Sequence, residues 1–364
     1  MKTYVYGAGE HGKVVTCYLV ECKKQKVDAI LVSKGHRELE YYQTPISLSG
    51  EIIPVVEVDE ESFSFNDSVC YVTLVSQKDV IIKKCRDLGA LDENIIDTIS
   101  VIGQYRNELF ELYLKSLNIN IENDILFLGK TKCMNFMKDS ALRGVFEGTV
   151  CDEIMPQVYN DCSLTVDGPY LNKELGVTIH SGDYVVDVGA NLGLFSCYAA
   201  EMGCHVYACD PDETCIKVLE EQKNFYPGQI EVLRYGLSDK VGDEVFYEST
   251  SCSISSIYMP RGTTIEKKIR VNTIDNLVYN GIIKRVDYIK ADIEGAERYM
   301  LRGAMETLRT QAPKLSICTY HYKDDPKVLE EIIKEANPNY VVTHSWRKLY
   351  AYVPSNIAPT GNII

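Results

Sequence analysis

The chain has 364 residues, of which 45% are hydrophobic and 25% charged, a composition that is ordinary for a globular protein and excludes a disordered or fibrous one. At about 150 residues per domain, this length predicts two domains. The net charge of −14, with no cluster of lysines and arginines, argues against nucleic acid or an anionic membrane surface as a partner.

The N-terminal residues lead directly into a strand-like run, and no stretch approaches about 18 uninterrupted apolar residues. We therefore expect neither a secretory signal peptide nor a membrane-spanning helix. The 13 cysteines are scattered without a C-x-x-C pair, which argues against a zinc site or a redox dithiol. A cytoplasmic protein with mostly reduced, buried cysteines is predicted.

The first predicted domain, residues 1–102, begins with a strand, a glycine-rich turn and a helical pattern. The turn places Gly7, Gly9 and Gly12 in a G-x-G-x-x-G spacing between the strand and the helix. This order is typical of a Rossmann-like α/β domain. Further strands are expected at 27–33, 52–60, 69–76 and 95–102, and a helix over 77–90 that ends at Gly89.

The ligand of this first domain is left open by the sequence. A nicotinamide cofactor needs an acidic residue at the end of the second strand, but that strand ends in Ser33-Lys34. The run YVYGAGEHGKVV resembles the N-terminal domain of bacterial sugar acyltransferases that hold nucleotide-sugars. The resemblance implies a UDP- or GDP-sugar bound at Gly7, Gly9 and Gly12, with its pyrophosphate near His11. The alternative is a module without a ligand, used for packing or for forming a homodimer.

Residues 103–163 show a weaker pattern and are predicted to connect the two domains. The segment QYRNELFELYLKSLN, residues 104–118, has apolar side chains at helical spacing and predicts one amphipathic helix. The rest of the segment has no clear period, and we expect it to pack on one or both domains.

The second predicted domain, residues 164–364, repeats the order of strand, glycine turn and helix, beginning with a strand over 184–188. Strand-like and helical runs then alternate, as in a parallel sheet, and two closely spaced strands at the end predict an antiparallel final strand. Strands are expected at 205–210, 230–239, 286–295, 314–320, 340–345 and 348–353, and helices at 213–225, at 296–311 and up to about 336.

The turn Gly189-Ala190-Asn191-Leu192-Gly193 lacks the pattern of a phosphate-binding loop and follows Asp187 on the strand. A carboxylate there would repel a pyrophosphate but accept hydrogen bonds from an ammonium group. Asp210, at the tip of the next strand, lies where folds of this type bind a ribose diol; the alternative is that it caps the following helix. A nucleoside joined to an amino acid without phosphate, such as S-adenosylmethionine, fits this pattern.

The second domain resembles the FkbM-type family of S-adenosylmethionine-dependent methyltransferases. The stretches that carry the resemblance are DGPY (167–170), GDYVVDVGANLGLFS (182–196), VYACDPD (206–212), GLSD (236–239), VNTIDNL (271–277), VDYIKADIEGAERYMLRGAMETL (286–308) and PKLSICTYH (313–321). The resemblance implies a seven-stranded class I methyltransferase sheet and methylation of hydroxyls on sugars, glycans or secondary metabolites. The cofactor-binding residues that it implies are Asp187, Gly189, Ala190, Asn191 and Gly193 at the methionine end, Asp210 and Pro211 at the ribose, Leu237 and Ser238 at the adenine, and Asp292 near the sulfonium.

An alcohol is a poor nucleophile until it loses its proton, so a general base is expected near the acceptor oxygen. His321 follows a predicted strand at the edge where open sheets bind ligands, and its ordinary pKa suits a base at neutral pH. Asp292 and Glu294 are the other catalytic candidates, and Tyr170 and Tyr320 are candidates for contacting the substrate.

Asp292, Glu294 and Glu297 offer carboxylates that would suit a magnesium or calcium ion. These residues are equally suited to orient substrate hydroxyls or to cap a helix, and no essential metal is predicted.

The sequence thus predicts an O-methyltransferase that uses S-adenosylmethionine and acts on a sugar, a nucleotide-sugar or a glycan precursor. Two alternatives remain: a nucleotide-sugar oxidoreductase that works through the first domain, and a binding protein that has lost catalysis.

Overall fold

The computed structural model describes residues 1–34, 53–59, 63–74, 77–116, 119–139, 142–143, 145–146, 169–249, 257, 264–345 and 347–354. The chain forms two compact units, each described here by itself. The N-terminal unit comprises Met1–Leu117 with Val158–Gly168, and the C-terminal unit comprises Asn118–Gln157 with Pro169–Ile364. The predicted connector, 103–163, is therefore divided between the two units.

The N-terminal unit is built on a five-stranded parallel sheet in the order β3-β2-β1-β4-β5. Its inner strands are nearly continuous apolar runs, as expected where both faces of a parallel sheet are covered. Its strands are β1 (Lys2–Tyr6), β2 (Ala29–Ser33), β3 (Val55–Val58), β4 (Ser68–Val72) and β5 (Ile95–Asp97), and its helices are α1 (Glu10–Cys17), a π-helical turn (Tyr18–Cys22), α2 (Lys78–Asp87), the 3-10 turns Asp92–Asn94 and Ile99–Val101, and α3 (Ile102–Ser116).

Two of the boundaries that differ from the predictions lie next to each other, at the end of β5 and the start of α3. The strand predicted over 95–102 ends at Asp97, whose carboxylate accepts a hydrogen bond from the backbone N–H of Ile99 (3.0 Å) and turns the chain away from the sheet. Helix α3 consequently begins at Ile102. It packs on the π-helical turn after α1, where the rings of Tyr18 and Tyr105 stack at 3.9 Å.

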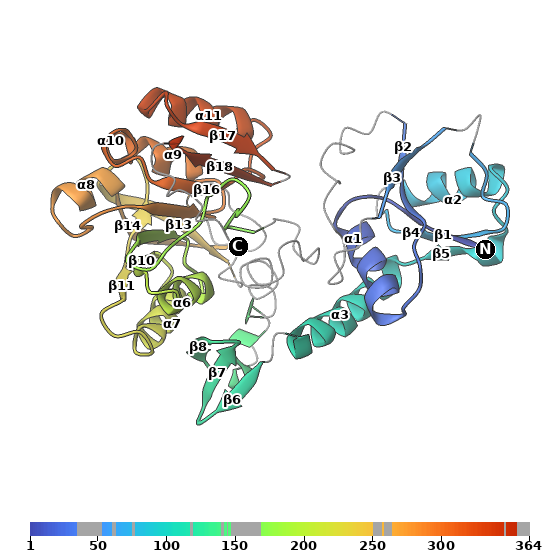
Figure 1. Ribbon diagram of the computed structural model, residues 1–364, viewed down its shortest axis with the longest axis horizontal. Helices are drawn as coiled ribbons and strands as arrows, with labels where there is room; N and C mark the ends of the chain where they lie inside the picture. The colour runs from blue at the N-terminus through green and yellow to red at the C-terminus, as the bar shows by residue number, and fades with distance from the viewer. Residues whose placement is uncertain are drawn as a thin grey trace, which may run out of the picture. The chain divides into compact units, whose positions relative to one another are not determined.

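The C-terminal unit has a seven-stranded sheet in the order β11-β10-β9-β15-β16-β18-β17 (Figure 1). The first five strands in this order are parallel, and β18 runs antiparallel to both of its neighbours. Its strands are β9 (Tyr184–Val188), β10 (His205–Cys209), β11 (Ile230–Leu233), β15 (Tyr288–Ala291), β16 (Lys314–Cys318), β17 (Val341–His344) and β18 (Lys348–Tyr352). The predicted α/β class, with its antiparallel strand at the end of the chain, is confirmed.

Helices cover both faces of this sheet. Figure 1 shows α6 and α7 on one face and α8, α9, α10 and α11 on the other. Their bounds are α6 (Leu194–Glu201), α7 (Glu213–Lys223), α8 (Ile274–Tyr279), α9 (Glu297–Arg302), α10 (Met305–Thr310) and α11 (Asp325–Ala336). Where a single helix was predicted over 296–311, the structure has α9 and α10. A Cβ on Gly303, at the break, would lie 2.0 Å from the Ser238 carbonyl oxygen, so the chain there is packed too tightly for any other residue.

Two small sheets were not predicted. Strands β6 (Asn120–Glu122), β7 (Ile125–Leu128) and β8 (Thr131–Met134) form an antiparallel meander, followed by the 3-10 turn Phe136–Lys138. Strands β12 (Gly236–Leu237), β13 (Gly242–Ser249) and β14 (Thr264–Asn272) form the other, so the strand predicted over 230–239 is divided between β11 and β12. Among the described helices, none is long and apolar enough to cross a bilayer.

Candidate active site

The turn between β9 and α6 lies against the end of β15. Gly189 (φ +75°), Asn191 (φ +51°) and Gly193 (φ +73°) all have left-handed backbone conformations. A Cβ on Gly189 would lie 2.1 Å from the carbonyl oxygen of Asp292. Glycine is therefore required at position 189, because the turn after β9 touches the backbone that follows β15.

Asp187, on β9, is fully buried beneath this turn. Its Oδ2 accepts a hydrogen bond from the Ser196 hydroxyl (2.6 Å), and its Oδ1 lies 3.1 Å from Nζ of Lys290, which is also fully buried. Lys290 Nζ donates in addition to the carbonyl oxygen of Gly189 (2.8 Å). The expectation that the Asp187 carboxylate faces a ligand does not fit this burial; the carboxylate instead supports the turn through Lys290.

Asp210 follows β10 and closes the same turn. Its Oδ2 accepts from the backbone N–H of Asn191 (3.0 Å) and its Oδ1 from that of Asp212 (2.9 Å). Burial raises the pKa of the Asp210 carboxyl to about 7. The alternative prediction, that Asp210 caps the following helix, does not hold. Asp212, two residues later, caps α7 by accepting hydrogen bonds from Thr214 N–H and Cys215 N–H.

Leu237 and Ser238, expected beside the adenine, are both buried after β11. Leu237 belongs to the hydrophobic core of the seven-stranded sheet, and the backbone N–H of Ser238 donates to the Asn272 carbonyl oxygen (2.9 Å). The contact of either residue with a cofactor stays a prediction.

Asp292, directly after β15, is held by two tyrosines. The hydroxyl of Tyr170 donates to its Oδ2 (2.9 Å), and the hydroxyl of Tyr320 donates to its Oδ1 (3.0 Å). Tyr170 is buried, with the ammonium groups of Lys290 and Lys348 5.1 Å and 4.0 Å from its ring centroid. Of the two tyrosines expected to contact the substrate, Tyr320 is half-buried, whereas Tyr170 serves to position Asp292.

His321 lies among three carboxylates. Its Nδ1 is 3.0 Å from Oε1 of Glu297, and its Nε2 is 3.4 Å from Oε2 of Glu294 and 3.8 Å from Oδ1 of Asp292. Burial would lower the pKa of His321, but Glu297, Glu294 and Asp292 outweigh it and raise the pKa to about 10. The pKa of Asp292 falls to about 2, because His321, Lys290 and Lys348 outweigh its own burial.

These values and contacts do not fit His321 as a free general base. The side chain of His321 has no exposed surface, and both ring nitrogens face carboxylates, so no acceptor hydroxyl reaches them directly. Of the carboxylate side chains around His321, those of Asp292 and Glu294 are the more exposed, at 21% and 13%, although Oε2 of Glu294 is itself buried. Glu294 follows β15 in a left-handed conformation (φ +52°), not in the extended strand end that was expected.

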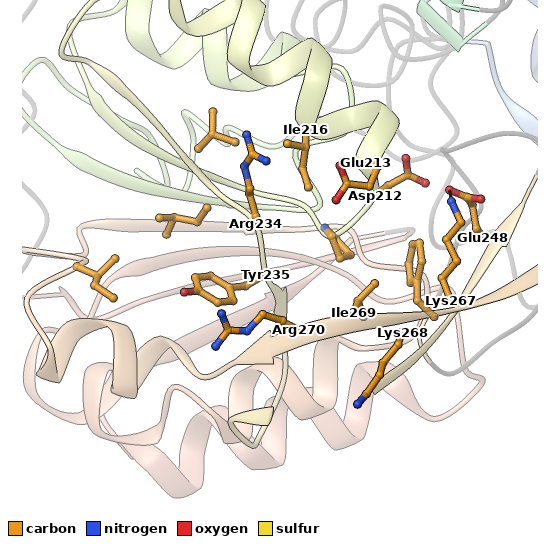
Figure 2. Close-up of a pocket in the computed structure, with 15 residues that line it drawn as sticks. Asp212, Glu213, Ile216, Arg234, Tyr235, Glu248, Lys267, Lys268, Ile269 and Arg270 are labelled. Carbon is orange, nitrogen blue, oxygen red and sulfur yellow. Dashed lines mark hydrogen bonds and ion pairs between the residues drawn. The ribbon is translucent and has the colours of Figure 1, made fainter. Parts of the chain in front are cut away.

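A cavity of about 550 Å³ lies between α7, β11 and the strand pair β13–β14 (Figure 2). Pro211 and Asp212 line it, but His321, Asp292 and Glu294 do not. Figure 2 shows acidic side chains and Lys267 toward one end, and Arg234, Tyr235 and Arg270 toward the other. Ion pairs join its cations to carboxylates: Arg234 to Glu220 (3.2 Å), Lys267 to Glu248 (2.5 Å) and Lys268 to Asp243 (2.8 Å).

The glycine turn of the N-terminal unit has the predicted place between β1 and α1. Gly7 has φ +116°, and a Cβ on Gly12 would lie 1.8 Å from the Gly7 carbonyl oxygen. A Cβ on Gly9 would meet nothing within 4 Å. Gly12 is thus required by packing within the turn, while binding of a nucleotide-sugar at Gly7, Gly9 and Gly12 stays a prediction.

Sequence reasoning missed Lys290, Lys348, Arg298 and Asp325. Asp325, at the start of α11, is buried, accepts from Arg298 Nε (3.1 Å) and from Tyr322 N–H (2.8 Å), and is also bound by Arg298 Nη2. Lys290 had a visible signal, because a lysine inside the otherwise apolar strand YIKA must have a buried partner.

The strand order of the C-terminal unit and the acidic residues at the ends of β10 and β15 define a methyltransferase-type α/β domain. Residues 187–341 match the family model described as the methyltransferase FkbM domain. The predicted family resemblance is confirmed there.

One curated relative is the hexuronic acid methyltransferase AglP of Haloferax volcanii, which is 29% identical over 163 residues. The match covers 44% of this chain and 65% of AglP, less than two thirds of that protein. Among solved structures, methyltransferase FkbM from Methylobacillus flagellatus KT matches 96% of this chain and 89% of its own, at 18% identity and a TM-score of 0.41. A putative rRNA methylase from Clostridium thermocellum matches 49% of this chain and 89% of its own, at 12% identity and a TM-score of 0.31. The family assignment rests on the sequence matches and not on these structural similarities.

Proposed function

We propose that the C-terminal unit is an O-methyltransferase that takes the methyl group of S-adenosylmethionine and places it on a hydroxyl of a sugar, a nucleotide-sugar or a glycan precursor. The observation that carries this proposal is that Asp210, Asp292, Glu294 and Tyr320 all follow parallel strands of one sheet at their carboxyl ends. Open α/β sheets bind their ligands at this edge. The FkbM match and the similarity to a hexuronic acid methyltransferase support the chemistry and a sugar acceptor.

The residues at this edge fit S-adenosylmethionine. Each carboxylate oxygen of Asp210 accepts one backbone N–H and keeps capacity for a further hydrogen bond, which suits the two hydroxyls of a ribose. The turn Gly189–Gly193 brings backbone close to the ligand site without a lysine or arginine for a phosphate. When bound, S-adenosylmethionine supplies an electrophilic methyl group on a sulfonium.

The remaining residues hold the acceptor. Tyr320 and Tyr170 fix the Asp292 carboxylate, and the partly exposed side chains of Asp292 and Glu294 orient a hydroxyl, one of the two carboxylates receiving its proton. Positioning supplies most of the acceleration of such a transfer, so the rigid support of these carboxylates matters more than their basicity.

The test is calorimetric titration of the full chain with S-adenosylhomocysteine, followed by a transfer assay with methyl-labelled S-adenosylmethionine and glycosides of hexuronic acids and neutral hexoses. We expect binding of S-adenosylhomocysteine that Asp210→Ala weakens, and a product whose labelled methyl carbon is bonded to oxygen by NMR. Absence of binding in the parent protein would overturn the proposal. A label on nitrogen or carbon would overturn the assignment to hydroxyls.

A further inference from the structure

The two ring nitrogens of His321 have different surroundings. Glu297, opposite Nδ1, is itself fixed, because its two carboxylate oxygens accept from the backbone N–H groups of Ile293 (2.9 Å) and Gly295 (3.1 Å). The charge of this carboxylate, 3.0 Å from Nδ1, favours a proton on that nitrogen, although the two groups are not aligned for a hydrogen bond. Nε2 is then the nitrogen that faces Asp292 and Glu294.

The Nε2 side of the ring lacks a well-formed hydrogen bond. The whole residue His321 is 7% exposed and its side chain is not exposed at all. Neither ring nitrogen makes an aligned hydrogen bond within the described part of the chain. The distances from Nε2 to Glu294 Oε2 (3.4 Å) and to Asp292 Oδ1 (3.8 Å) exceed the usual range of about 2.7–3.2 Å for N–H···O. A neutral nitrogen lone pair directed at two carboxylates is repulsive, so either a proton on Nε2 or a cation bound in its place belongs between them.

The spacing of these three atoms suits a shared cation. Ligand atoms that each lie about 2.1 Å from one ion are roughly 3.0–3.4 Å apart when they subtend 90–109° at the metal. One ligand atom from each of Asp292, Glu294 and His321 lies within 4.8 Å of the others. A small adjustment of side-chain torsions brings all three to coordination distance.

We propose that Asp292, Glu294 and His321 bind a divalent cation through two carboxylates and one imidazole, with Glu297 orienting the ring from the opposite side. A carboxylate that receives the second N–H of a ligating histidine is the usual support of such a ligand. The mixed oxygen and nitrogen ligand set favours a first-row ion such as Mn²⁺ over Ca²⁺. This proposal departs from the sequence analysis, which predicted no essential metal and considered Glu297 only as one of three carboxylates that would suit an ion.

The neighbouring group of Glu297, His321 and Asp325 has similar spacing but is not open to an ion. Asp325 and Glu297 are each 1% exposed, and their oxygens are engaged by Arg298 and by backbone N–H groups. Asp292 and Glu294 keep exposed surface, which gives an ion an entry path and open coordination positions. Binding of the ion is independent of the proposed methyl transfer; only its use, to hold and acidify an acceptor hydroxyl, rests on that function.

The experiment is titration of the chelator-treated full chain with Mn²⁺, in which the EPR signal of free Mn²⁺ measures binding without any substrate. We expect one site per chain, binding at least 100-fold weaker in Glu294→Gln and His321→Gln, and about 10–100-fold weaker in Glu297→Gln. The matched control is Glu306→Gln, an exposed carboxylate paired with Arg309, which should bind Mn²⁺ like the parent. Circular dichroism establishes that each variant is folded, and Asp292→Asn replaces any that is not.

Two outcomes overturn the metal site: a parent protein that binds no Mn²⁺, or a folded Glu294→Gln that binds it as the parent does. The former would mean that a proton on Nε2 supplies the positive charge. Titration of the same samples with S-adenosylhomocysteine separates the two proposals. A protein that binds S-adenosylhomocysteine but not Mn²⁺ would overturn only the metal site. A protein that binds Mn²⁺ but not S-adenosylhomocysteine would overturn only the proposed methyltransferase.

Discussion

Replacing Lys290 by methionine tests the buried ion pair that supports the turn Gly189–Gly193. The substitution keeps most of the volume of the side chain and removes its charge. Asp187 is then left fully buried with one hydrogen bond, from Ser196, and the Gly189 carbonyl oxygen loses its donor. Removing one partner of a buried ion pair costs roughly 3–5 kcal/mol, because the other charge is left uncompensated. We expect Lys290→Met to lower the free energy of unfolding of the C-terminal unit by an amount in that range.

The double variant Lys290→Met/Asp187→Leu gives the sharper comparison. It removes both charges, and replacing a buried pair by apolar residues is often neutral or stabilising. Its remaining losses are the hydrogen bonds of Ser196 and Gly189, about 1 kcal/mol each. The double variant should therefore be more stable than Lys290→Met alone.

Urea unfolding followed by circular dichroism measures these differences. The control is Arg309→Met, the same kind of change in a pair whose side chains are about 60% exposed, and it should have little effect. A decrease of less than about 1 kcal/mol in the unfolding free energy of Lys290→Met would refute the argument, since an uncompensated buried carboxylate should destabilise the fold by more than that. The argument would also be refuted if the unfolding free energy lost by the double variant equalled the sum of the losses measured for Lys290→Met alone and for Asp187→Leu alone.

The remaining predictions concern other parts of the two units. Because the pKa of Asp210 is raised to about 7 from an unfolded value of ~3.9, its contribution to stability is full below pH ~4 and is lost as the pH rises through 7. Asp210→Asn should remove this loss, so that urea midpoints at pH 5 and pH 8 differ less in the variant than in the parent; an unchanged difference would contradict the shift. Asp210→Ala should weaken S-adenosylhomocysteine by ~1–3 kcal/mol in calorimetry, and equal affinity would remove Asp210 from the site. In the N-terminal unit, Gly12→Ala should destabilise by ~1–3 kcal/mol or more in thermal unfolding, whereas Gly9→Ala, with open space around its Cβ, should not; equal effects would show that the turn is packed differently.

The parallel strands were predictable because each is a short β-branched run between a turn and a helical pattern. The two small sheets were not, since β6, β7 and β8 have only three or four residues each and β12 has two. The break between α9 and α10 depends on the approach of Gly303 to Ser238, a contact between segments distant in sequence that no local pattern encodes.

The candidate site was predictable in its membership but not in its roles. Sequence order placed Asp187, Asp210, Asp292 and His321 at strand ends, and the structure gathers the last two with Glu294. Which of these side chains face solvent depends on their partners, and the partners come from other strands and helices. Asp187 is buried in an ion pair with Lys290 of β15, and the ring of His321 is buried against the carboxylate of Glu297 of α9.

This difference in exposure separates the acidic residues of the edge into two kinds. Asp187 and Glu297 are at most 1% exposed, and each is joined to a buried group that has to be neutralised, Lys290 or His321. Asp210, Asp292 and Glu294 keep some surface, so direct contact with a ligand is open to them. Neutral replacements of the first kind should therefore act mainly on the unfolding free energy. Those of the second kind should act mainly on ligand or metal binding, since the oxygens that they change are the ones a ligand can reach.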